Sequence, residues 1–312
     1  MISQLQNLAS SIVSNATTVA TSTVVASSSE RLPIYFLSHG SPMWAIEKNQ
    51  TSEFFEVEGK SIAALADKYE GIVVVSAHWE NRSGFGTPGV KVTAKDGNLD
   101  LIYDFYGFPK QMYEIKYPVA GSAVLADKVF QAVKSSGIKI EKDVSRGVDH
   151  GFWVPLRKMI DPALKIPMVQ LSLAENASYD FHLNLGKALG PLVKPDPASG
   201  RTKGILFIAS GSSVHNLRAI NFNDINGPPD AWAKNFDDRL VKFVAETPSA
   251  EYCDKWADFV AADTATLKKA HPSVEHLMPL VVALGIASGA ETQKAAAVHR
   301  HYYSNLSATC LR

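Results

Sequence analysis

The chain has 312 residues, of which 46% are hydrophobic and 20% are charged, and its 31 basic residues balance 31 acidic ones. A zero net charge without a dense basic tract gives no reason to expect nucleic acid or an anionic membrane as a partner. No run approaches the roughly 20 consecutive apolar residues that span a bilayer, so we expect a soluble, cytoplasmic protein that acts on small molecules.

The amino terminus differs in composition from the rest of the chain. Residues 1–29 are rich in Ser, Thr, Ala and Val and carry no charged side chain. They lack the charged start and apolar core of a signal peptide, and also the arginines of a mitochondrial presequence. We expect a flexible extension over residues 1–30, with a short docked helix as the alternative, and a single catalytic domain over residues 31–312.

Strand-like and helix-like segments alternate from residue 32 onward. Apolar runs bounded by turn residues predict strands at 34–37, 72–75, 166–173 and 205–209. Apolar residues at helical spacing predict helices over 61–69, 122–135, 179–192, 230–245 and 277–286. Residues 87–118 contain several Gly, Pro, Tyr and Phe residues and predict a long ordered excursion outside the sheet. The alternation predicts an α/β fold with a mainly parallel or mixed central sheet flanked by helices.

Two of the predicted strands end in the same way, with a histidine among small residues. The run at 34–37 leads into Ser-His-Gly with His39, and the run at 72–75 leads into Ser-Ala-His with His78. Because a short, wholly apolar run indicates a strand buried on both faces, each histidine falls at the carboxyl end of a central strand. Ligands bind at that edge of an open α/β sheet. The two imidazoles therefore predict the beginning of a metal site.

Further ligands must come from distant segments that fold onto the same edge. His215 follows a Ser-Gly-Ser-Ser turn after the strand at 205–209, and His276 precedes the helical run at 277–286. The alternative is that both residues only cap or bridge loops. Cys253 and Cys310 have no metal-binding spacing, which favours a reducing compartment and excludes a zinc-finger site. Imidazoles alone suit zinc, iron, copper or nickel.

His150 lies in Gly-Val-Asp-His-Gly, beside Asp149 and next to a glycine that allows close approach. Such a setting suits a general acid or base, although a turn histidine bonded to its own loop has the same pattern. His182, His299 and His301 are interpreted as ordinary core or surface histidines. Motifs for nucleotide binding and for a serine nucleophile elbow are absent from the sequence.

Taken together in order, seven segments resemble the class III extradiol ring-cleavage dioxygenases, most closely their 4,5-DOPA dioxygenase-like branch. The segments are Ser38–Pro42, Ser76–Glu80, Tyr103–Pro109, Asp149–Gly151, Ile166–Ser172, Val214–Arg218 and His271–His276. They extend over nearly all of the chain between residues 32 and 286. Each segment is unspecific alone, whereas seven in the same order are specific.

The resemblance implies a single α/β domain whose pocket holds one divalent non-haem metal ion, Fe²⁺ for ring cleavage or Zn²⁺ in some members. Carried over motif by motif, the metal-binding positions are His39, His78, His215 and His276. His150 is similar in context to the acid/base histidine of the family. The implied substrates are a DOPA-like catechol and O2.

Counting coordination positions raises a question about His215. A catecholate takes two positions on six-coordinate iron and O2 takes a third, which leaves three for the protein. Our hypothesis is that four imidazoles close a tetrahedral zinc site at rest, whereas with iron and substrate His215 leaves the metal and acts as a base toward the catechol hydroxyl.

The remaining expectations concern the surroundings of this site. Asp149 is expected to tune His150, and His271 is a candidate neighbour of the ligands. Candidates for the pocket wall are Tyr106, Trp79 and Phe152. Tyr103 stands where some relatives have histidine, and so affects which ring substituent is accepted. A zinc hydrolase and a catalytically silent metal- or catechol-binding relative are the alternative functions.

Overall fold

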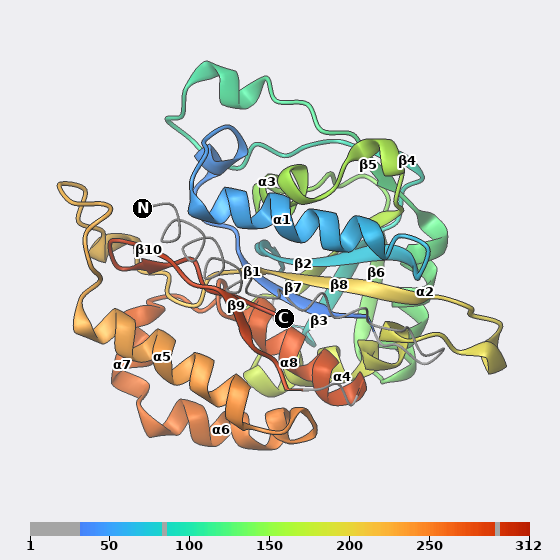
Figure 1. Ribbon diagram of the computed structural model, residues 1–312. Helices are drawn as coiled ribbons and strands as arrows, with labels where there is room; N and C mark the ends of the chain where they lie inside the picture. The colour runs from blue at the N-terminus through green and yellow to red at the C-terminus, as the bar shows by residue number, and fades with distance from the viewer. Residues whose placement is uncertain (1–31, 83–85, 291–293) are drawn as a thin grey trace, which may run out of the picture. The chain divides into compact units, whose positions relative to one another are not determined.

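The fold is built on a mixed β-sheet, which the computed structural model describes together with its helices over residues 32–82, 86–290 and 294–312 (Figure 1). In these residues the main sheet has ten strands, in the order β4-β5-β7-β2-β8-β1-β12-β9, and β3 joins it by pairing with β7 and β6. The described residues belong to one compact unit, Arg31–Arg312. The predicted extension at 1–30 lies outside the described residues. The predicted fold class is confirmed.

Four parallel strands form the centre of the sheet. They are β7 (Met168–Ala174), β2 (Tyr69–Asn81), β8 (Gly204–Gly211) and β1 (Ile34–Ser38). In their register Phe36 lies opposite Ala209, and Val74 lies opposite both Ile208 and Gln170. Each of the four overlaps one of the predicted apolar runs. Since they run in the same direction, their carboxyl ends meet at one edge, as the sequence predicts.

Strand β2 is much longer than predicted. It continues past the apolar run to Asn81, so His78 lies within the strand and not after it. The register against β7 shifts between Val75 and Glu80, which marks an irregularity where the histidine is placed. Small side chains at Ser76 and Ala77 allow the buried strand to continue here. Bulges of this kind re-aim side chains beside active sites.

The prediction that residues 87–118 lie outside the sheet is wrong for the first part of this segment. Here β3 pairs in parallel with β6, and Val92 lies opposite Leu171 of β7. Val90 and Val92 are buried on one face of this strand, and Thr93 on the other face is buried as well. The outer strands are β3 (Gly89–Thr93), β4 (Gly97–Leu99), β5 (Val119–Gly121), β6 (Lys139–Asp143), β9 (Ala297–His299) and β12 (Cys310–Leu311). A separate hairpin joins β10 (Tyr302–Tyr303) to β11 (Leu306–Ser307).

Helices cover both faces of the sheet. In Figure 1, α1 and α3 lie on one face and α4 and α8 on the other. The helices are α1 (Gln50–Ala64), α2 (Ala123–Ser135), α3 (His150–Met159), α4 (Tyr179–Leu189), α5 (Ala231–Glu246), α6 (Tyr252–Ala262), α7 (Thr264–Ala270) and α8 (Met278–Ala290). None of the described helices is long and apolar enough to cross a membrane.

The predicted helix over 61–69 is wrong in its position. The side chains of Asn49 and Ser52 form a capping box, which starts α1 at Gln50, and the helix ends at Ala64. Tyr69 already begins β2. The apolar residues at 61–69 therefore belong to the last turn of a helix and to the start of a strand.

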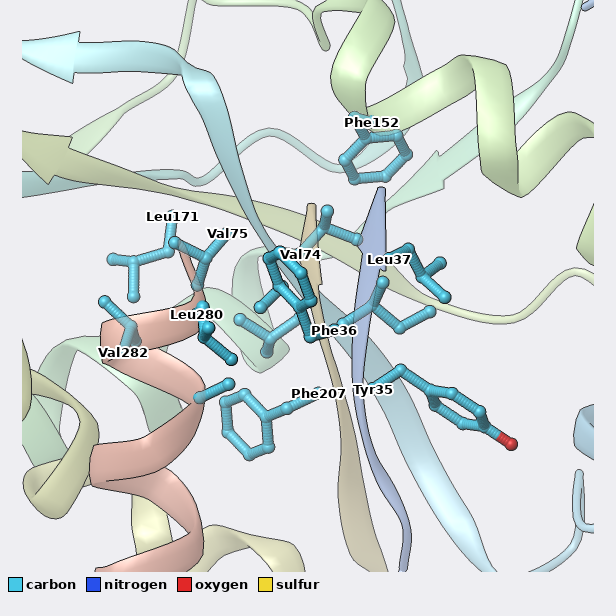
Figure 2. Packing of buried hydrophobic residues seen from close by; sticks show 14 of the residues in the cluster. Tyr35, Phe36, Leu37, Val74, Val75, Phe152, Leu171, Phe207, Leu280 and Val282 are labelled. Atoms are coloured by element: carbon cyan, nitrogen blue, oxygen red, sulfur yellow. The ribbon is translucent and has the colours of Figure 1, made fainter. Parts of the chain in front are cut away.

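Apolar side chains from the strands and from α8 fill the core (Figure 2). Phe207 of β8 and Leu280 of α8 are buried together on one side of the strands, and Phe152 of α3 is fully buried as well. Burying one such side chain contributes about 1.5–3 kcal/mol to folding. Because α8 is apolar on all sides, nearly all of its residues are buried, and the residue that precedes it by two positions, His276, is held in the interior.

Candidate metal centre

Three histidines from distant parts of the chain meet at the carboxyl edge of the sheet. Nε2 of His78 lies 3.1 Å from Nε2 of His39 and 3.2 Å from Nε2 of His276. Nitrogens bound to a shared ion at about 2.1 Å lie roughly 3 Å apart, so the three imidazoles fit a single divalent metal ion. His39 follows β1, His78 lies in β2, and His276 precedes α8.

Backbone contacts hold two of these histidines against the end of β8. The N–H of His39 donates to the carbonyl of Gly211 at 3.1 Å, and the N–H of Ser212 donates to the carbonyl of His276 at 2.9 Å. A Cβ on Gly211 would lie only 2.2 Å from that carbonyl oxygen of His276. The glycine is therefore needed for the segment before α8 to approach the strand so closely.

Each of the three imidazoles has a partner at its other ring nitrogen. Nδ1 of His39 lies 3.0 Å from Oγ of Ser210, and Nδ1 of His276 lies 2.8 Å from Oε1 of Glu275. Nδ1 of His78 lies 3.3 Å from Oδ2 of Asp104. Such partners fix the ring orientation and the tautomer, and they leave Nε2 free to bind a metal.

Burial keeps these imidazoles in the neutral form that binds metals. Burial, and then the neighbouring histidines, lower the pKa of His39 and His276 well below the usual value. For His78, burial and the adjacent His150 lower the pKa to about 3, against the opposing effect of Asp104. All three side chains are therefore neutral at neutral pH, as metal ligands must be.

His150 lies directly beside this group. Its ring centroid is 3.9 Å from that of His78, and its side chain is almost fully buried. Nδ1 of His150 lies 3.0 Å from Oδ1 of Asp104, and the backbone N–H of His150 donates to the same oxygen at 2.9 Å. Burial raises the pKa of Asp104, but the contacts with His150 outweigh it and lower the pKa below its usual value.

The carboxylate within ion-pair distance of the ring of His150 is that of Asp104. The expected influence of Asp149 on His150 is limited to the interaction between their charges. Asp149 is the N-cap of α3, where it accepts from the N–H of Phe152 at 3.2 Å and from Oγ of Ser76 at 2.7 Å. Gln170 also donates to it. Burial raises the pKa of Asp149. The capping role explains the position of the Asp149 side chain, which satisfies a free N–H of the first turn of α3.

His215 reaches the same region but joins it differently. Its ring stacks on that of His276, with centroids 3.5 Å apart and planes 11° from parallel. Nδ1 of His215 lies 4.0 Å from Oε1 of Glu275. Potential ligand atoms of His215, Glu275 and His276 lie close together in one group. His215 is not part of the other group, which consists of His39, His78 and His276. Burial lowers the pKa of His215, against the opposing effect of Glu275.

The other histidines lie outside these groups. His271 is buried, with Nε2 2.9 Å from the carbonyl oxygen of Ser213. His182 accepts from the N–H of Ala174 through Nε2, and His299 stacks on Phe54. These contacts agree with the structural interpretation of His182 and His299.

The aromatic residues expected at the pocket wall make no ring contact with the site histidines among the described residues. Phe152 packs in the core, and Tyr106 is 89% exposed. Trp79 is covered by the guanidinium of Arg146, 4.6 Å from its ring centroid. The aromatic ring at the site is that of Phe105, which faces His150 edge-on at 5.8 Å.

Tyr103 is held by the backbone, since its hydroxyl donates to the carbonyl of Ile115 at 2.6 Å.

Asp104, Ser210 and Glu275 are the site residues that sequence reasoning did not assign. Glu275 and Ser210 were visible only as neighbours of motif residues. Asp104 lies in an irregular segment, where no periodicity indicates which way a side chain points.

Comparisons with known proteins agree with this geometry. The family model of the catalytic LigB subunit of aromatic ring-opening dioxygenase matches residues 33–310. The 4,5-DOPA dioxygenase extradiol of Beta vulgaris is 36% identical over 275 residues, which cover 86% of this chain and 91% of that protein. That of Escherichia coli K12 is 34% identical over 270 residues, covering 85% and 88%.

The fold also has a counterpart of known structure. The crystal structure of an uncharacterized protein from Escherichia coli K12 matches with a TM-score of 0.68 at 28% identity, over 90% of this chain and 99% of that one. The resemblance found in the sequence motifs is thereby confirmed. The chain belongs to the LigB family, and it is a class III extradiol dioxygenase that opens the ring of a catechol.

Proposed function

We propose that this enzyme cleaves a catechol with a DOPA-like side chain, using O2 and a ferrous ion held by His39, His78 and His276. The observation that carries the proposal is that Nε2 of His78 lies 3.1 Å from Nε2 of His39 and 3.2 Å from Nε2 of His276, while each Nδ1 has another polar group nearby. The relatives named 4,5-DOPA dioxygenase support the choice of substrate.

His215 is proposed as the base and not as a ligand during turnover. Two stacked rings direct their in-plane lone pairs side by side, so His215 and His276 do not converge on one point as His39 and His78 do. A neutral imidazole beside the metal ligands can accept the proton of a catechol hydroxyl. The four-imidazole zinc site at rest remains a prediction.

His150 is proposed to hold and deliver a proton on the oxygen side of the reaction. Oδ1 of Asp104 lies 3.0 Å from its Nδ1, within ion-pair distance but without hydrogen-bond geometry, and Nε2 is the nitrogen proposed to hydrogen-bond a bound molecule. The imidazole is buried, so bulk water is excluded from this position. His39, His78 and His276 would hold the ferrous ion, which would supply Lewis acidity and one-electron chemistry toward the catechol and O2.

The two alternative functions have less support. A zinc hydrolase or a silent binding protein could contain the same imidazoles, but the matching relatives are named as dioxygenases.

We also propose a cytoplasmic location, which fits two cysteines that form no disulfide, Cys253 and Cys310. The flexible extension over residues 1–30 stays a proposal.

Anaerobic reconstitution of metal-free protein tests the proposed function. Ferrous iron, followed by air, should give oxygen uptake with DOPA and a new absorbance of the ring-opened product, and zinc should give neither. Protocatechuate, which lacks the amino-acid side chain, should be a poorer substrate. Zinc-dependent hydrolysis without oxygen uptake would overturn the proposal.

A further inference from the structure

One carboxylate lies between a metal-site histidine and the histidine proposed as acid. Oδ2 of Asp104 lies 3.3 Å from Nδ1 of His78, and Oδ1 lies 3.0 Å from Nδ1 of His150. These distances join two imidazoles that are 72 residues apart in sequence, as their numbers show. Among the described residues, His78, Asp104 and His150 also form a close group of their own.

The carboxylate is fixed by a third contact that does not depend on either imidazole. Oδ1 of Asp104 accepts the backbone N–H of His150, the first residue of α3, at 2.9 Å. That N–H has no partner within the helix, and the positive end of the helix dipole favours a negative charge there. The side chain of Asp104 is only 25% exposed. It is therefore anchored by the start of α3 before it acts on the two rings.

An imidazole without a partner at Nδ1 can rotate and exchange the positions of its two nitrogens. A carboxylate at Nδ1 prevents this exchange and leaves the Nε2 lone pair facing the site. Because Asp104 contacts both rings, losing it would release His78 and His150 together. Glu275 has a similar place between His276 and His215, but its distance to His215 is 4.0 Å, so the link is looser.

We infer that Asp104 is a positioning residue that orients two imidazoles at once: that of His78 for metal binding and that of His150 for proton transfer. This inference rests on the proposed roles of the two histidines. It predicts two separable losses from one substitution, one in metal affinity through His78 and one in turnover through His150.

A double-mutant cycle separates positioning from a general structural effect. The variants are D104N, H150Q and the double variant, and kcat is measured by oxygen uptake with DOPA at saturating ferrous iron. We expect D104N to lower kcat by about 10- to 100-fold in the wild-type background but by less than about twofold in the H150Q background. If the double variant loses kcat by the product of the two single-variant factors, Asp104 does not act through His150.

Metal affinity is the second readout, and it needs no turnover. Competition of Zn²⁺ between the protein and a chelator should show a loss of about 10- to 100-fold for D104N and for the double variant, and little change for H150Q. An unchanged zinc affinity in D104N would overturn the role toward His78. If the wild-type enzyme cleaved no catechol, the proposed function would fail. The zinc competition assay would still test the contact between Asp104 and His78.

Matched controls guard against loss of the fold. Asp100 lies four residues away and has an 81% exposed side chain, whose one ion pair among the described residues is with Lys95 at 3.8 Å, so D100N should match wild type in both assays. If D104N proves unfolded by circular dichroism, D104S replaces it, because a hydroxyl group keeps one acceptor but cannot reach both rings. Wild-type values of both kcat and zinc affinity in D104S would contradict the inference.

Discussion

The imidazoles of His215 and His276 stack with their centroids 3.5 Å apart and their planes 11° from parallel. This arrangement places His215 next to a metal-site histidine without directing its ring toward the same point as His39 and His78. The stacked pair is the basis of the proposal that His215 acts as a base beside the metal ligands.

Replacing His215 should separate turnover from metal binding. We expect H215Q to keep iron through gel filtration and to lose about 10²- to 10⁴-fold in kcat, the usual contribution of a general base. Oxygen uptake and iron analysis on the same sample measure both quantities. Loss of iron equal to that of a ligand variant would show that His215 binds the metal during turnover.

Replacing His39 should have the opposite pattern to replacing His150. H39A removes one of the three converging nitrogens, so the protein should no longer retain iron and should show no oxygen uptake. H150A should retain iron and turn over slowly, because its ring lies beside the group without completing it. Equal metal loss in both variants, measured by metal analysis after dialysis, would contradict the separate roles.

Gly211 should be essential for metal affinity, although it has no side chain. In G211A the new Cβ would meet the carbonyl oxygen of His276 at 2.2 Å, and the backbone must move by enough to displace the histidine. We expect a loss of about 1–3 kcal/mol in unfolding free energy together with weaker zinc binding.

A crowded glycine on another strand, β3, provides the control for that experiment. A Cβ on Gly89 in β3 would lie 3.0 Å from the carbonyl oxygen of Lys139, so G89A should reduce stability without changing zinc affinity. Chemical denaturation and chelator competition measure the two effects. Zinc binding by G211A as tight as that of G89A would rule out the proposed need for close approach.

His182 should make the metal-free protein less stable in acid. Burial lowers its pKa to about 4 in the folded state, against 6.5 for an unperturbed side chain. Above pH 6.5 the group is neutral in both states and has no effect. As the pH falls from 6.5 toward 4, the unfolded chain gains a proton that the folded chain does not, which costs up to about 3 kcal/mol of stability.

The variant H182Q tests this by removing the titrating group. Its unfolding free energy, measured with a chelator at pH 7 and at pH 5, should fall less than that of wild type over the same interval. The hydrogen bond from the N–H of Ala174 can be kept by the amide oxygen of glutamine. Identical pH dependence in both proteins would mean that His182 does not titrate as described.

The centre of the fold could be predicted from the sequence because its signals are local. Wholly apolar runs bounded by turn residues located β1, β2, β7 and β8, and the parallel arrangement followed from the alternation with helices. The strand β3 was missed because it is short and lies among Gly and Pro residues. The helix at 61–69 was misplaced because a capping box further upstream, not the apolar spacing, sets its start.

Site residues could be predicted from the sequence only where they lie in or next to a buried strand or helix. His39, His78 and His276 were found through the strands and the helix next to them. Asp104 was not found, because its position depends on an irregular segment that folds back onto the start of α3. That Asp149 caps α3 was not predicted either, because adjacency in sequence does not show which backbone groups a side chain reaches.

X-ray absorption spectroscopy of the iron-loaded protein tests the central claim most directly. One iron per chain, with three imidazole nitrogens at about 2.1 Å in wild type and loss of that signal in H39A, is the predicted result. An iron spectrum that is the same in wild type and H39A would place the ion elsewhere and contradict the account.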